Sequence, residues 1–156
     1  MNTTNECGDA ATSMAAVIAD ALGKVPFAEW LGLRLGSIEG DRVFIDFETR
    51  AELVGNSEKN VLHGGVIASV LDTVGGLAAL LGFLTRSDSG ADSSELSPWL
   101  STIDMRTDFL RPGIGERFDA CAFPLRVGNR LVVTRMELHG ESGHLIAVGT
   151  GTYVLP

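Results

Sequence analysis

The stretch NVLHGGVIASVLDTVGGLAALLGFL, residues 60–84, decides the fold of this chain. It opens with His63-Gly64-Gly65 and continues as an apolar run in which Asp72 is the only charged residue. Backbone N–H groups at the start of a helix lack intrahelical acceptors, so the glycines predict donors for a developing negative charge. A lone carboxylate in an apolar run needs a role, because burying it unpaired is costly. The stretch therefore predicts an oxyanion binder followed by a base or nucleophile, the pattern of an acyl-transfer site.

The spacing within this stretch adds a constraint. Gly64 and Gly65 precede Asp72 by eight and seven residues, which in a helix is an axial separation of ~10–12 Å. A reacting carbonyl has to lie about 3 Å from both the oxyanion donors and the attacking group. One helix therefore cannot supply both groups to one substrate, whereas a second copy of the chain, related by a two-fold axis, can.

Two other interpretations of the apolar run have to be weighed. A transmembrane span needs about 20 apolar residues, but an aspartate in mid-span costs roughly 2.5–3.5 kcal/mol on insertion scales. The β-rich pattern downstream also argues against a membrane protein. A simple core helix, with Asp72 satisfied by a neighbouring side chain, remains an open alternative.

Composition limits the class of protein. A chain of 156 residues fits one domain, and a formal net charge of −8 argues against non-specific nucleic-acid binding. Cys7 and Cys121 have no metal-binding spacing and give no disulfide framework, and His139 and His144 fit a turn better than a metal site. No signal-peptide pattern is seen. We expect a cytoplasmic protein without a metal.

The periodicity of the remaining chain predicts a polar, disordered tail over residues 1–12, a helix over Ser13–Leu22, and a helical turn in which Phe27, Trp30 and Leu31 pack on the core. Strands are predicted at Leu33–Ile38, Arg42–Phe47, Ser101–Phe109, Phe118–Val127, Leu131–Leu138 and Leu145–Val154, with a long polar loop at 85–98. A long apolar helix followed by an antiparallel meander favours an α+β fold, in which a curled antiparallel sheet wraps around one long central helix.

HGG, an Asp nine positions after the His, and STIDMRTDFLRPG at residues 101–113 resemble the hotdog-fold acyl-CoA thioesterases of the PaaI (phenylacetate-pathway) type. The resemblance covers roughly residue 27 to the C-terminus. It implies a tail and short helix over 1–26, a single hotdog domain over 27–156, and hydrolysis of an acyl-CoA to free acid and CoA. It also implies a homodimer or a dimer of dimers with sites at the subunit interface. No cofactor is implied beyond the CoA of the substrate, and no nucleic-acid or membrane partner.

The resemblance also implies roles for individual residues. The N–H of Gly64, at the start of the helix with Gly65, would bind the thioester oxygen. Asp72 of the partner subunit would act as general base or nucleophile. Thr102 falls where relatives place a hydroxyl that positions water. Regular alternation over Ser101–Phe109, however, puts Ile103, Met105 and Phe109 on one face and Thr102 on the other, which leaves Ser101 as the alternative on the helix side. His63 would orient the loop.

Two further assignments stay open. Relatives often carry an Asn six residues before the His; that position is Ser57 here, and a one-residue slip would let Asn56 take the role. Arg111, Arg126 and Arg130 are the candidates for binding CoA phosphates, since arginine matches phosphate geometry, but they fit solvated strand ends almost equally well.

Two rival functions are less well supported. A hotdog dehydratase or hydratase needs a His paired with an acid, and the sequence offers only His63. A non-catalytic acyl-CoA sensor of this fold usually carries an added DNA-binding segment, and residues 1–26 are too short and acidic for one.

Overall fold

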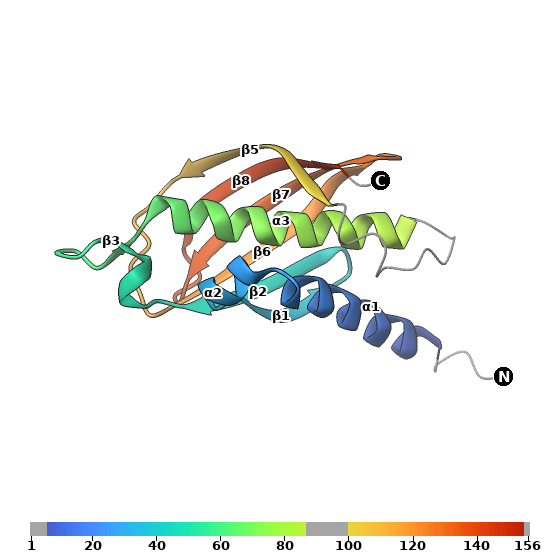
Figure 1. Cartoon of the computed structure of the whole chain (residues 1–156), viewed down its shortest axis with the longest axis horizontal. Helices are drawn as coiled ribbons and strands as arrows, with labels where there is room; N and C mark the ends of the chain where they lie inside the picture. Colours follow the sequence, from blue (N-terminus) through green and yellow to red (C-terminus); the bar gives the residue numbers. More distant parts are fainter. Residues whose placement is uncertain (1–5, 87–99, 155–156) are drawn as a thin grey trace.

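The computed structural model describes residues 6–86 and 100–154 (Figure 1). From residue 87 on, the predicted loop at 85–98 lies outside these ranges. The elements are α1 (Glu6–Gly23), α2 (Pro26–Leu31), β1 (Arg34–Glu39), β2 (Arg42–Glu48), a 3-10 turn (Ala51–Leu53), β3 (Val54–Asn56), β4 (Val61–Leu62), α3 (Gly64–Arg86), β5 (Ser101–Phe109), β6 (Arg117–Val127), β7 (Leu131–Gly140) and β8 (Leu145–Val154).

Six strands form one antiparallel sheet in the order β1-β2-β6-β7-β8-β5, which curls around α3 (Figure 1). The α+β architecture of a sheet wrapped around one long helix is confirmed. The prediction of one continuous meander is right for β6, β7 and β8 but wrong for β5, which pairs with β8 at the sheet edge. The link after β5 is hydrogen-bonded to β8, because the N–H groups of Leu110 and Arg111 both donate to the Ile146 carbonyl.

The central helix α3 is a core element. It is long and apolar enough to cross a membrane, but 67% of its most apolar window is buried inside the fold. Its buried residues extend from Ile67 to Gly82 and meet the inner face of the sheet. The half-exposed residues Ser69, Asp72 and Thr73 interrupt this burial on one side. The carboxylate therefore lies where the helix is not fully covered.

The N-terminal segment differs from its prediction. Helix α1 begins at Glu6 rather than Ser13, so residues 6–12 are helical where disorder was expected. Ala10 and Ala11 favour a helix there, whereas Gly8 and Thr12 do not, so intrinsic propensity alone does not account for the extension. Ile18 and Leu22 are buried in the core next to α3. The division of the chain into a tail and short helix over 1–26 and a single domain over 27–156 stays a prediction.

The prediction that two aromatic residues of α2 pack on the core is wrong. Leu31 is buried as expected, but Phe27 and Trp30 are each 52% exposed. Their rings stack on one another, and the Arg50 guanidinium lies over the Trp30 ring. A six-residue helix has only one narrow face against the core, which Ala28 and Leu31 fill.

Strand β5 carries an irregularity that alters its side-chain alternation. Its register with β8 shifts between Thr102 and Asp104. Ile103, at the irregularity, is 55% exposed rather than on the core face with Met105. Because an extra residue reverses the alternation, Thr102 reaches α3 together with Met105. The predicted face of Ile103 is therefore wrong, and the parity that favoured Ser101 over Thr102 does not hold.

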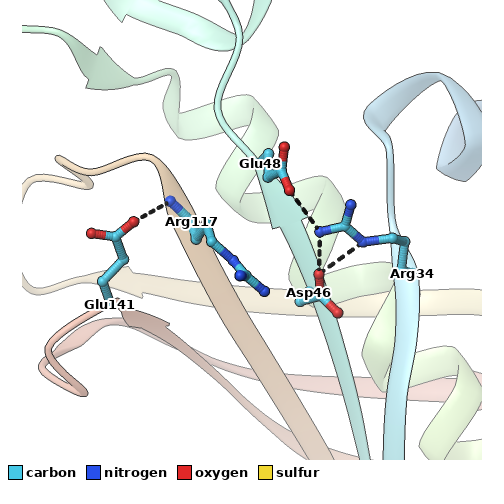
Figure 2. A network of polar contacts seen from close by, with 5 residues as sticks. All are labelled: Arg34, Asp46, Glu48, Arg117 and Glu141. Atoms are coloured by element: carbon cyan, nitrogen blue, oxygen red, sulfur yellow. Dashed lines mark hydrogen bonds and ion pairs between the residues drawn. The ribbon is translucent and has the colours of Figure 1, made fainter.

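The outer strands are joined by an exposed polar network (Figure 2). The Arg34 guanidinium on β1 donates to Asp46 at 2.9 and 2.5 Å and to Glu48 at 3.2 Å on β2. The Arg117 N–H donates to Glu141 at 3.0 Å. Exposed pairs of this kind contribute little to stability. The Arg34 contacts link β1 to β2, and none of the five residues lines the three cavities described below.

Candidate functional site

The carboxylate of Asp72 is held by two hydroxyl groups from the sheet. The Thr102 hydroxyl on β5 donates to Asp72 Oδ1 at 2.8 Å, and the Tyr153 hydroxyl on β8 lies 3.2 Å from the same oxygen. Tyr153 also donates to the Asp72 backbone carbonyl at 3.1 Å. Among the described residues, Oδ2 has no hydrogen-bond partner. One carboxylate oxygen is thus fixed while the other stays available.

Tyr153 is the residue of this cluster that sequence reasoning missed. Its ring is buried, and burial, followed by the nearby Asp72 charge, raises the pKa of the Tyr153 phenol well above its usual value. The phenol therefore stays protonated and acts as a donor. Glycines give it room: a Cβ at Gly75 would lie 2.9 Å from Tyr153 Cζ, and one at Gly151 would lie 3.0 Å from its hydroxyl. These glycines were the only signal in the sequence.

A cavity of about 240 Å³ opens beside this carboxylate. Asp72, Thr102 and Tyr153 lie at its wall, and the remaining lining is almost wholly apolar. The α1–α2 region contributes through Leu22 and Val25. An apolar pocket with a carboxylate at its wall is suited to an apolar substrate that reacts at one polar end.

The start of α3 presents a different set of groups. The Gly65 N–H donates to His63 Nδ1 at 2.9 Å, so it is already satisfied. The N–H groups of Val66 and Ile67 are taken by the His63 carbonyl. Within the described residues, the Gly64 N–H has no acceptor. His63 thus caps the helix, and Gly64 carries the free donor.

A second cavity, of about 420 Å³, lies at this helix start. Its lining includes Asn56, Gly64, Phe109 and Arg111. The pairing of β3 with β4 shifts its register between Val54 and Asn56. Asn56 lines the same cavity as Gly64. Its Oδ1 accepts from the Lys59 N–H at 3.1 Å.

The predicted site residues thus fall into separate places on one chain. Asp72 and Thr102 lie together at the 240 Å³ cavity, and Ser101 is not part of its lining. Gly64, Asn56 and Arg111 belong to the 420 Å³ cavity.

The three predicted phosphate-binding arginines are likewise divided. Arg111 is at the 420 Å³ cavity, where its guanidinium donates to the Leu145 carbonyl at 2.8 Å. Arg126 and Arg130 line a third hollow, of about 370 Å³, at the β6–β7 turn. A single chain does not bring the three together.

A possible metal-binding group lies elsewhere. Cys121, Glu137 and His139 offer ligand atoms within 4.8 Å of one another, and this is the only such group in the described ranges. Their alternation with buried Ala120, Met136 and Leu138 places them on the sheet face away from α3. Burial chiefly raises the pKa of the Cys121 thiol, and the neighbouring Arg42 cation disfavours a metal ion. The group therefore lies across the sheet from α3, the helix that carries Asp72.

Comparison with known proteins places the chain in a family. Residues 59–147 match the model of the thioesterase superfamily. The chain is 43% identical over 134 residues to the medium/long-chain acyl-CoA thioesterase YigI of Escherichia coli strain K12, covering 84% of this chain and 86% of the relative. A crystal structure of a Shewanella oneidensis protein related to the thioesterase superfamily superposes with a TM-score of 0.84 at 41% identity, covering 96% and 97% of the two chains.

The Escherichia coli PaaI protein of the phenylacetic acid degradation operon shares the fold, with a TM-score of 0.75 at 20% identity over 94% of this chain and 96% of that one. The chain belongs to the thioesterase superfamily and has its hotdog fold. It is a thioester hydrolase.

Proposed function

We propose that the protein hydrolyses acyl-CoA thioesters to a free acid and CoA, with Asp72 as the general base or nucleophile. The observation that carries this proposal is the Asp72 carboxylate, fixed through Oδ1 by Thr102 and Tyr153 and open through Oδ2, beside an apolar cavity. The name of the relative YigI, a medium/long-chain acyl-CoA thioesterase, supports the same substrate class.

The oxyanion donor in this proposal is the Gly64 N–H of a second chain. Within one helix, Gly64 and Asp72 are eight residues apart, or ~12 Å along the axis, and they face different cavities. A two-fold dimer sets the start of one α3 beside the middle of the other. Strand β5 supports such pairing, because it is an edge strand and leaves Ile103 and Phe109 more than half exposed. A dimer of two such dimers is equally compatible with this site.

The chemistry follows from these groups. Asp72 either removes a proton from an attacking water or attacks the thioester carbon itself, and the second route requires water to hydrolyse the resulting anhydride. In both, the carbonyl oxygen gains negative charge that the free N–H at the helix start stabilises. The CoA sulfur leaves as the C–S bond breaks and takes up a proton. Asn56 lines the same cavity as Gly64, from which its amide can assist the oxyanion or the water.

The phosphates of CoA need cations on an acidic protein. Arg111 is the first candidate, because it borders the Gly64 cavity from which the CoA moiety would emerge. Arg126 and Arg130 would reach the CoA only if a neighbouring subunit brings the β6–β7 turn to it.

The test is Asp72→Asn. The amide can neither attack nor accept the proton, so kcat on acyl-CoA should fall by ~100-fold or more, while the protein stays folded and still binds acyl-CoA. Asp41→Asn, at the exposed β1–β2 turn, is the matched control and should leave kcat unchanged. A kcat for Asp72→Asn within about threefold of the parent, less than ~1 kcal/mol of barrier, would show that Asp72 is structural.

A further inference from the structure

The cavity beside Asp72 is elongated along α3. Asp72, Gly76 and Leu80 are spaced four residues apart along α3 and all line it, so they form one stripe running toward the end of the helix. The facing wall comes from Leu22 and Val25 in the α1–α2 region. The cavity is thus a groove between α1 and α3.

The lining is polar at one end only. Thr102 and Tyr153 bond Asp72, and Thr73 is its neighbour in the chain, so every polar side chain of the lining lies at that end. Beyond it, the described lining carries no charge and no polar side chain. Such a groove suits an unbranched hydrocarbon chain whose reacting carbonyl lies at Asp72, and it disfavours acyl groups with a second polar end.

We propose that this α1–α3 groove binds the fatty acyl chain and limits it to about eight to ten carbons; this inference rests on the proposed acyl-CoA hydrolysis. From Asp72 to Leu80 the helix rises ~12 Å, which matches about nine or ten carbons of an extended chain at roughly 1.25 Å per carbon. The groove volume of about 240 Å³ is compatible with a chain of this length.

Two residues of the stripe set the limit. Gly76 leaves the path of the chain open: a Cβ there would lie 3.2 Å from Leu100 Cδ2 and 3.6 Å from Tyr153 Cε1, so it would narrow the groove just past the carboxylate. Leu80 is the lining residue of α3 furthest from Asp72 and is fully buried, so we assign the limit at the far end to its side chain. Because Leu22 of α1 forms part of the facing wall, helix α1 also contacts the bound chain in this proposal.

The experiment measures kcat/KM on saturated acyl-CoAs from four to sixteen carbons. In the parent, kcat/KM should rise by about fourfold per added methylene and stop rising at about eight to ten carbons. Gly76→Ala should move this limit to shorter chains by one or two carbons. Leu80→Ala should move it to longer chains by two or three. Gly23→Ala, with nothing within 4 Å of the added Cβ, is the control and should leave the limit in place.

The readout is the shape of the chain-length profile, because Gly76→Ala also lies near Tyr153 and can change all rates together. Gly76→Ala favours the helix intrinsically, so it provides the test even if Leu80→Ala, a core truncation, does not fold. A Gly76→Ala profile that superimposes on that of the parent after scaling would overturn the inference and leave acyl-CoA hydrolysis standing. Absence of hydrolysis on every chain length in the parent would overturn both.

Discussion

At the scale of the residue, the cluster around Asp72 joins positions that are far apart in sequence. Thr102 was expected from family resemblance, whereas Tyr153, separated from Asp72 by 81 positions, was not. Hydrogen-bond partners across a fold leave no periodic signal in the chain. Asp72 itself could be predicted, because a single charge in an apolar helix is conspicuous without any knowledge of its partners.

The raised pKa of Tyr153 predicts how stability depends on pH. The unfolded chain loses this proton near pH ~10, while the native state keeps it, so the native state binds more protons above that pH. The free energy of unfolding should therefore fall by up to ~1.4 kcal/mol per pH unit above ~10. Tyr153→Phe should lack this part of the decline, and the Cys121 titration cancels because both proteins carry it.

The measurement is straightforward because Tyr153 is the only tyrosine in the chain. Phenolate absorbance should stay absent in the native protein beyond pH ~10 and appear when the protein unfolds. An ordinary titration near pH ~10 with the fold intact would contradict the burial and the hydrogen bond to Asp72.

At the scale of the element, the sequence predicted what periodicity can encode. The apolar run predicted α3 together with its start at Gly64, and alternation predicted the six strands of the main sheet to within a few residues. The short strands β3 and β4 were not predicted. The irregularity at Ile103 was not predictable, because one extra residue reverses the side-chain alternation without altering composition. The pairing of β5 with β8 was also not predicted, because the sequence of the β5–β6 link does not indicate which strand β5 pairs with.

The three candidate phosphate-binding arginines lie at two places, Arg111 in the β5–β6 link and Arg126 and Arg130 at the end of β6 and in the β6–β7 turn. If the β5–β6 link holds a CoA phosphate, Arg111→Ala should raise KM for acyl-CoA by about tenfold, as expected for a charge-assisted contact, with kcat within about twofold. Arg126→Ala and Arg130→Ala should do the same only if the β6–β7 turn of a neighbouring subunit reaches the CoA.

Arg34→Ala is the control for the loss of one positive charge, since Arg34 lies in the exposed network at the β1 edge (Figure 2). The effect of Arg111→Ala should disappear on a thioester that lacks the nucleotide. Equal losses of kcat/KM on the complete and the truncated thioester would argue against phosphate contact.

At the scale of the whole molecule, one chain holds each half of the proposed site but does not combine them. The free Gly64 N–H and the Asp72 carboxylate face separate cavities, and β5 leaves the sheet with an open edge and exposed apolar side chains. The separation of Gly64 from Asp72 could be predicted from the sequence, because an α-helix has a fixed rise per residue. The arrangement of two chains was beyond reach of the sequence, because it depends on surfaces that only the folded sheet creates.

Subunit mixing tests the two-chain site most directly. Gly64→Pro removes the donor at the first position of α3, where proline is well tolerated. Gly64→Ala keeps that donor and places its Cβ at an ordinary 3.5 Å from the Phe109 ring, so it serves as the control. Gly64→Pro and Asp72→Asn should each be folded and inactive alone, whereas Gly64→Ala should stay active.

Each mixed dimer of Gly64→Pro with Asp72→Asn has one doubly defective site and one intact site. After subunit exchange at equal concentrations, acyl-CoA hydrolysis should therefore appear at about a quarter of the parent activity, the share of intact sites expected for random two-fold pairing. Verified mixed dimers that remain inactive would contradict the central claim that Asp72 of one chain works with Gly64 of the other.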